Sequence, residues 1–113
     1  MSAKHRRVKP GIGDVLEVPT RNGLRYGQYT HEHPEFGSLL RVIEGAHKIR
    51  PSDLARLVRG RTTFVTFFPI AEAVRRGIFE IVGRTRVPGA DRSFPLFKAA
   101  GSRDVATRAG LEW

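Results

Sequence analysis

Apolar and polar residues largely alternate on both sides of Asn22-Gly23, over positions 16–20 and 24–29. This pattern predicts a β-hairpin, because every second side chain of a strand points to the same face. Asn22-Gly23 suits a two-residue type I′ turn, in which both central residues take positive φ angles. That turn would place Val18 opposite Gly27, with one apolar face and one polar face on the hairpin.

Two residues of the hairpin indicate how its strands are placed relative to their neighbours. Pro19 cannot donate a hydrogen bond to a neighbouring strand, so we expect it at the turn end or on an exposed edge. Gly27 contributes no side chain to the apolar face. It therefore indicates either a β-bulge or a close approach of another segment to the backbone.

Three further β-rich runs follow, at positions 38–44, 62–68 and 79–82. The run 62–68 contains no charged residue and is the most apolar, so we expect it to be a central strand with both faces covered. Phe64 and Phe67 should then be buried. Base stacking is the less favoured function for these rings, since stacking platforms are exposed and interleaved with basic residues.

Helix signals occur at two places between these runs. Pro51-Ser52-Asp53 followed by Gly60 predicts a short helix near Ser52 to Val58, with Arg56 and Arg59 on its solvated side. The stretch from Pro69 to Gly77 repeats this pattern and predicts a second helix near Ile70 to Arg76.

The chain is therefore expected to belong to the α+β class and to be mainly β. We predict an antiparallel sheet of five or six strands, curled into a partly open SH3-like barrel with one or two short helices, because no helix is long enough for a routine parallel crossover. Residues 1–10 read as a basic flexible tail and 11–113 as a single domain. We expect the apolar residues at 94–97 to pack across the folded domain. Residues 98–113 would form an edge strand or a loosely held tail.

Composition narrows the environment and the partners. The chain lacks cysteine, and no apolar run reaches the ~20 residues needed to span a bilayer, so we expect a soluble, cytoplasmic protein. The formal net charge is +9, and 16 of the 20 basic residues are arginine. This balance favours an acidic partner, which could be nucleic acid, a protein surface or anionic lipid. Because the charges are spread along the chain, compositional bias is an equally weighted explanation.

The residues give no pattern typical of an enzyme. Gly11-Ile12-Gly13 lacks the third glycine and the following helix of a dinucleotide fingerprint, and a P-loop is absent from the sequence. His31 and His33 could share a strand face, but Pro34 ends that strand and no third ligand has a matched spacing. We therefore expect neither catalysis, nor a cofactor, nor a metal, although carboxylates could still meet in space.

Two segments resemble the immunity protein 26 family over about residues 11–97. The first is a Gly-Asp followed by an apolar strand, a Pro and then Tyr-Gly; the second is a Gly, an aromatic residue, apolar residues and a Gly. The matching positions are Gly13, Asp14, Pro19, Tyr26, Gly27, Gly77, Phe79 and Gly83. The resemblance implies a bacterial, largely β protein that binds and blocks a cognate polymorphic toxin without catalysis or a cofactor. Phe79 replaces the usual Trp, and the positive charge implies a toxin with an acidic surface.

Two binding functions follow from these observations. For an immunity-type module, the expected contact residues are Arg25, Tyr26, Gln28, Arg56 and Arg59. The alternative is a small basic β-barrel that binds nucleic acid, and the residues expected for it are Arg56, Arg59, Arg75, Arg76, Arg84 and Arg86. A contiguous arginine surface beside exposed aromatic residues would favour the alternative. Without such a surface, nucleic-acid binding should be weak and independent of sequence. The oligomeric state is not predicted.

Overall fold

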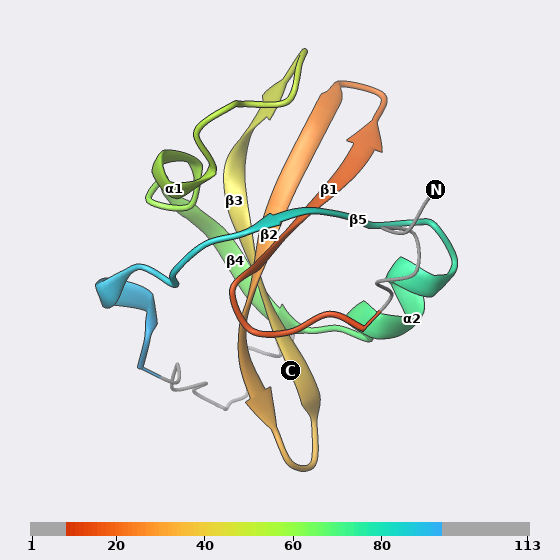
Figure 1. Ribbon diagram of the computed structural model, residues 1–113, viewed down its shortest axis with the longest axis vertical. Helices are drawn as coiled ribbons and strands as arrows, with labels where there is room; N and C mark the ends of the chain where they lie inside the picture. Colours follow the sequence, from red (N-terminus) through yellow and green to blue (C-terminus); the bar gives the residue numbers. More distant parts are fainter. Residues whose placement is uncertain (1–8, 94–113) are drawn as a thin grey trace.

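The computed structural model describes residues 9–93 of the chain (Figure 1). Five strands and three short helical segments make up this part. They are β1 (Asp14–Thr20), β2 (Gly23–His33), β3 (Gly37–His47), α1 (Leu54–Leu57), β4 (Thr62–Phe67), α2 (Ile70–Arg75), β5 (Glu80–Arg84) and the 3-10 helix η2 (Gly89–Asp91). Residues 1–8 of the predicted tail at 1–10 lie outside the described residues, as do the predicted apolar segment at 94–97 and residues 98–113.

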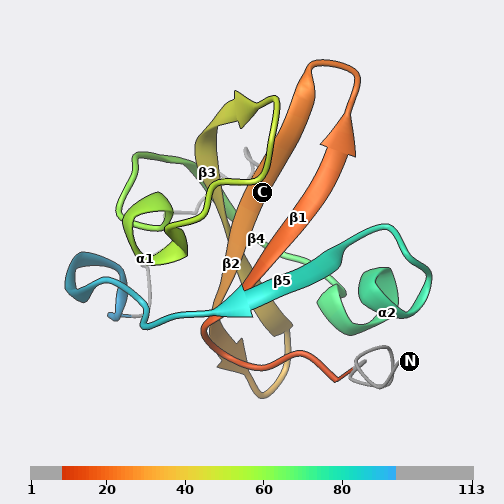
Figure 2. The ribbon, with the colours of Figure 1, turned by 45° about the horizontal axis from the view of Figure 1, so that its top comes forward.

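The five strands form one antiparallel sheet in the order β4-β3-β2-β1-β5. Strands β1 to β4 are a meander, and β5 returns to pair with β1 at the opposite edge. The strands turn strongly from one edge to the other, and the sheet does not close on itself (Figure 2). The prediction of a mainly β, partly open barrel with two short helices is confirmed.

The β1–β2 hairpin has a different register from the predicted one. Leu16 pairs with Gly27, and the turn residues are Arg21 and Asn22. Gly23 instead begins β2 with a φ angle of +124°, and a Cβ atom there would lie 2.9 Å from the carbonyl oxygen of His47. The glycine is thus required for packing against β3. Because the register moves by two residues, each side chain keeps its predicted face.

Both faces of the hairpin are buried, so the predicted polar face is wrong. Neighbouring residues of β1 belong to two hydrophobic clusters, since Val15 packs beside α1 and Leu16 beside α2. The two helices therefore cover opposite faces of the sheet. Glu17 and Gln28 lie on the α1 side and are 5% and 0% exposed. Burial of these polar groups requires internal hydrogen-bond partners.

The expectations for Pro19 and Gly27 agree with the structure. Pro19 is exposed near the turn. A Cβ atom on Gly27 would lie 2.8 Å from Leu40 Cδ1 and 3.1 Å from the carbonyl oxygen of Arg41. Gly27 therefore permits the close approach of β3, and the bulges between β2 and β3 occur on either side of it.

Strand β4 is not central, which corrects the prediction for residues 62–68. It pairs with β3 alone and forms one edge of the sheet. Phe64 is 52% exposed and Phe67 is partly buried. The α2 side of the sheet is packed around Leu16, Leu40 and Ile70, a cluster that does not include Phe64. An uncharged sequence thus marks an edge strand here, contrary to the usual association of such runs with central strands.

The helices form where the terminal residues predicted them. The Asp53 side chain caps α1 by accepting a hydrogen bond from the backbone N–H of Arg56 at 3.0 Å. Val58 is buried while Arg56 and Arg59 are exposed, as expected for an amphipathic segment. Helix α2 ends before Gly77, whose φ angle of +79° suits the left-handed conformation after a helix.

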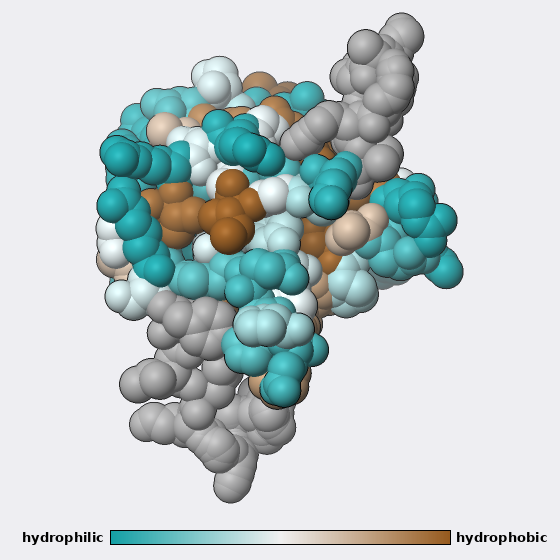
Figure 3. All heavy atoms as spheres, turned by 60° about the horizontal axis from the view of Figure 1, so that its bottom comes forward, coloured by the Kyte–Doolittle hydropathy of each residue, from teal (hydrophilic) through white to brown (hydrophobic). Residues whose placement is uncertain are grey.

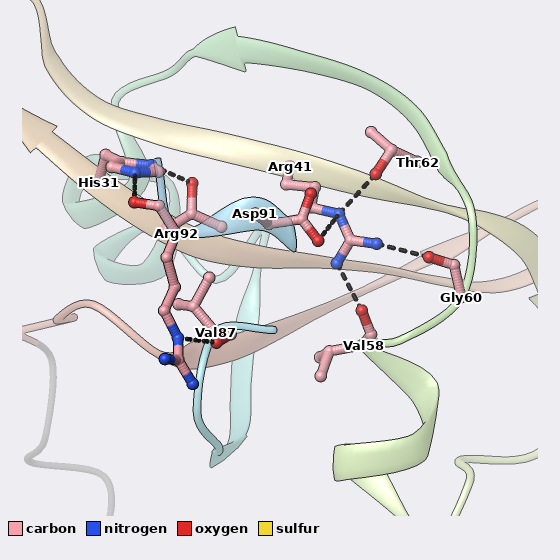
Figure 4. A network of polar contacts seen from close by, with 9 residues as sticks. His31, Arg41, Val58, Gly60, Thr62, Val87, Asp91 and Arg92 are labelled. Atoms are coloured by element: carbon pink, nitrogen blue, oxygen red, sulfur yellow. Dashed lines mark hydrogen bonds and ion pairs between the residues drawn. The ribbon is translucent and has the colours of Figure 1, made fainter. Parts of the chain in front are cut away.

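A buried arginine connects β3 with three later segments (Figure 4). Arg41 is 2% exposed, and its guanidinium donates to Thr62 Oγ1 and to the carbonyl oxygens of Val58 and Gly60. Its Nε also lies 3.5 Å from Asp91 Oδ2 in η2. A guanidinium has only donors, so it needs acceptors on several sides when it is removed from water.

Replacing Arg41 should destabilise the fold strongly. Arg41→Met would remove the donor from the buried carbonyl group of Val58, and a buried unsatisfied acceptor costs ~1–3 kcal/mol. It would also remove the charged hydrogen bonds to Gly60 and Thr62, and hydrogen bonds to charged groups contribute ~1.5–3 kcal/mol each. We expect the free energy of unfolding in urea to fall by at least about 3 kcal/mol. The control Arg21→Met, in the exposed turn, should change it by about 0.5 kcal/mol or less. Equal stability of the two variants would contradict this role of Arg41.

Because β4 is an edge strand, we expect truncation of an apolar side chain on β4 to cost less unfolding free energy than truncation of a buried one on β3. Leu39 is 0% exposed, so Leu39→Ala should cost about 2 to 5 kcal/mol of unfolding free energy. Phe64→Ala should cost about 1 kcal/mol or less, because the ring remains half in water. Chemical denaturation of both variants measures the difference. A larger cost for Phe64→Ala would show that its ring belongs to the core.

Candidate partner-binding surface

The residues on which the resemblance to the immunity family rests have structural roles, and Asp14 is the first example. This side chain is 0% exposed and accepts hydrogen bonds from the backbone N–H of Gly11 and from Arg84 Nε, both at 2.8 Å. Gly13 beside it has a φ angle of +100° and donates its N–H to the carbonyl oxygen of Tyr29. Gly-Asp thus turns the chain into β1 and fastens it to β2 and β5.

The second group of resembling residues supports the two helices. The Phe79 ring stacks on Phe68 with their centroids 5.3 Å apart, beside the cluster under α2. A Cβ atom on Gly83 would lie 2.5 Å from Leu54 Cδ1, so the glycine allows α1 to lie close to β5. These residues therefore hold the helices against the sheet.

Two of the predicted contact residues are buried, which corrects that part of the prediction. Tyr26 is 2% exposed, and its hydroxyl donates to Glu17 Oε2 at 2.6 Å. Gln28 is 0% exposed, and its amide donates to the carbonyl oxygens of Gly13 and Thr85. These side chains hold the interior together and do not reach a partner.

The Tyr26 contact belongs to an electrostatic network that runs from the buried Glu17 to the half-exposed Arg50. Arg50 donates to both carboxylate oxygens of Glu17, at 2.8 and 2.9 Å. The hydrogen bond from Arg50 is the main cause that lowers the pKa of Glu17. Burial, followed by the bond to Glu17, raises the pKa of Tyr26 to about 12. Glu17 is therefore a structural anion.

The other predicted contact residues are separated. Arg25 is partly buried on the α2 side of the sheet. Arg56 lines a hollow of about 650 Å³ between the end of β3 and α1, together with His47 and Arg50. Arg59 lies on the boundary of a different pocket. Sequence reasoning grouped these residues, but the fold does not.

The structure does bring three arginines together, and Arg59 is one of them. Arg59, Arg86 and Arg92 line one pocket of about 370 Å³, whose walls also include Val58, Val87 and Pro88. A second pocket of about 650 Å³ shares Arg86 and Arg92 and adds His31 and Arg84. We call the surface formed by Arg59, Arg86 and Arg92 the arginine face.

The arginine face has positive charge that is not neutralised locally. Arg59, Arg86 and Arg92 form no ion pair with another residue of the described part of the chain. By contrast, five arginines are paired. These pairs are Arg41–Asp91, Arg50–Glu17, Arg75–Glu72, Arg76–Glu72 and Arg84–Asp14. The fold therefore neutralises these five arginines locally and leaves the charges of the arginine face available.

The six arginines predicted for nucleic-acid binding do not form one surface. Arg75 and Arg76 both pair with Glu72 on α2, and Arg84 pairs with Asp14. Of that set, Arg59 and Arg86 line one pocket, and Arg86 shares a second pocket with the paired Arg84. The predicted set is thus replaced by a smaller group.

Apolar side chains are also exposed in places. The view in Figure 3 shows a largely hydrophilic face with a small apolar patch bordered by hydrophilic side chains. Phe36 is 64% exposed at the β2–β3 turn and stacks against His33, with the ring centroids 4.8 Å apart. Small apolar patches and single exposed apolar side chains are normal on protein surfaces, so these positions alone do not define a binding site.

His31 and His33 take part in local hydrogen bonds. His31 Nδ1 lies 2.9 Å from Thr30 Oγ1 and its Nε2 lies 2.7 Å from the carbonyl oxygen of Arg92. Strand β2 ends at His33, directly before Pro34. Within residues 9–93, no three His, Asp or Glu side chains are grouped as metal ligands would be. Over the same residues, the helices are too short to traverse a bilayer.

Comparison with known proteins gives no relative. No family model, no curated protein and no solved structure matches the chain.

Sequence reasoning missed Arg92 and the position of His31 beside it. The spacing of Arg84 and Arg86 indicates a common side of an extended segment, but Arg84 is paired. Arg92 and Arg59 are 33 positions apart in the sequence and meet through tertiary packing. No sequence spacing reports such a meeting.

The Glu17–Arg50 pair predicts a pH-dependent stability difference. Because the pKa of Glu17 is lower in the folded state, its ionised carboxylate stabilises the fold at pH values above the unfolded pKa of ~4.3. This contribution disappears as the pH falls through the folded pKa. Arg50→Gln should therefore be less stable than wild type at neutral pH, and the gap should narrow under acid. Urea unfolding at a series of pH values measures it, with Arg21→Gln as the control. A gap that stays constant with pH would show that the ionisation of Glu17 does not contribute to it.

Proposed function

We propose that this protein is a bacterial, cytoplasmic immunity-type module that binds a cognate polymorphic toxin and neutralises it by protein–protein contact. The main support is that the resembling residues form a coherent scaffold. Gly13 and Asp14 place β1, Gly27 admits β3, and Phe79 and Gly83 support the helices. Such agreement is expected when a family shares a fold and varies its contact surface.

The titratable groups in the interior support binding in preference to catalysis. Asp14 and Glu17 are buried, and each is held by an arginine and by a further hydrogen bond. Catalytic carboxylates instead line a cavity where a substrate can reach them. In this protein the buried carboxylates connect strands, so we propose that it has no enzymatic activity and requires no cofactor.

The toxin surface should be acidic. The chain has a net charge of +9, and the arginine face leaves three guanidinium groups unneutralised. Charge complementarity accelerates the encounter of partners and excludes partners of like charge. The protein would therefore bind a toxin away from any basic groove in which the toxin binds nucleic acid.

The test is a binding titration with the toxin domain that this proposal expects the neighbouring open reading frame to encode. We expect a tight complex, with a dissociation constant of about 10⁻⁷ M or lower, and protection of cells that express the toxin. The matched control is the immunity protein of an unrelated toxin. Failure of the purified pair to associate, with no protection in cells, would refute the immunity function.

Nucleic-acid binding is the second candidate, because the arginine face exists and Phe36 is exposed. However, His33 occupies one side of the Phe36 ring, which reduces its use for base stacking. Labelled DNA and RNA should bind weakly and lose affinity as salt rises from about 50 to about 200 mM. Nanomolar, sequence-selective binding at physiological salt would establish this candidate in place of the first.

A further inference from the structure

We propose that the arginine face is the docking surface for an acidic segment of the partner protein, with Arg59, Arg86 and Arg92 binding its carboxylates. This inference rests on the proposed binding function and specifies its surface and ligand chemistry. The three residues come from separate parts of the fold. Arg59 follows α1, Arg86 follows β5, and Arg92 follows η2. They nevertheless line one pocket of about 370 Å³.

The backbone beneath these arginines is held in place by internal hydrogen bonds. Arg41 binds the carbonyl oxygens of Val58 and Gly60, the two residues that flank Arg59. The same guanidinium lies 3.5 Å from Asp91, the residue before Arg92 (Figure 4). A buried cation therefore positions two of the three exposed ones. Such preorganisation lowers the entropy that is lost on binding.

Arg92 is fixed from two further directions. Its Nε donates to the carbonyl oxygen of Val87 at 2.9 Å, and its own carbonyl oxygen lies 2.7 Å from His31 Nε2. The first bond holds the guanidinium beside the shared pocket wall, since Val87 lines both pockets. A bidentate acceptor such as a carboxylate fits a guanidinium that is already oriented.

Two acidic residues next to residues of this surface in the sequence or in its pockets are already paired with other arginines. Asp14 is 0% exposed and binds Arg84, and Asp91 binds Arg41. The rim of the pocket therefore attracts anions, while its walls include the apolar residues Ala55, Val58, Val87 and Pro88. This combination matches a segment that presents acidic side chains beside apolar ones.

The pocket walls favour a protein segment over nucleic acid. Among residues 9–93, those that line this pocket include no aromatic ring on which a base could stack. Its volume of about 370 Å³ is near the lower limit for ligand pockets and suits a few side chains. Nucleic acid is therefore the competing occupant to be tested.

The experiment compares Arg59→Glu/Arg86→Glu with Arg21→Glu/Arg61→Glu, a pair with the same change in charge. Arg21 and Arg61 are exposed and line neither pocket of the arginine face. Binding is measured to the toxin domain, to a fluorescein-labelled oligoglutamate peptide and to labelled single-stranded DNA, each at low and physiological salt. Circular dichroism and thermal unfolding confirm that both variants fold.

We expect the Arg59/Arg86 variant to lose at least about 30-fold in affinity for the toxin domain, and the control pair about threefold or less. Oligoglutamate should show the same order. Equal losses in the two variants would overturn the assignment to this surface, as would a larger selective loss for DNA than for oligoglutamate. If wild type binds oligoglutamate through Arg59 and Arg86 but not the toxin domain, the surface stands and the immunity function fails.

Discussion

The buried guanidinium of Arg41 is the interaction on which much of the structure depends. Removing a charge from water is unfavourable unless surrounding groups replace its hydration, and here the replacements come from Thr62 and from the carbonyl groups of Val58 and Gly60. These acceptors belong to the end of α1 and the start of β4. Strand β3, helix α1 and strand β4 must therefore assemble together around one side chain.

The same requirement links the interior with the surface. Because Arg41 also lies beside Asp91, it fixes the position of η2 relative to α1. Arg59 and Arg92 extend from these two places into solvent. The geometry of the arginine face is thus determined by a residue that no partner can touch, while its charge is supplied by residues that contribute little to the core.

The structure also explains why a family resemblance can concern a scaffold more than a binding site. Gly27 is needed because β3 approaches closely, and Gly83 because Leu54 lies above it. Asp14 is needed because it joins the start of β1 to β5. Residues of this kind can persist while exposed arginines change with the partner, since a fold does not define a function.

The sequence by itself determined the local elements: glycines and Asp53 located the turns and the start of α1, and the β-rich runs located the strands. The order of those strands does not follow from the sequence in the same way, so the apolar run at 62–68 wrongly predicts a core position for Phe64. Whether an apolar run is central or at an edge depends on which strands pair with it. The burial of Tyr26 and the grouping of Arg59 with Arg92 are likewise determined by tertiary packing. Periodicity reports the face on which a side chain lies, whereas only packing determines what covers that face.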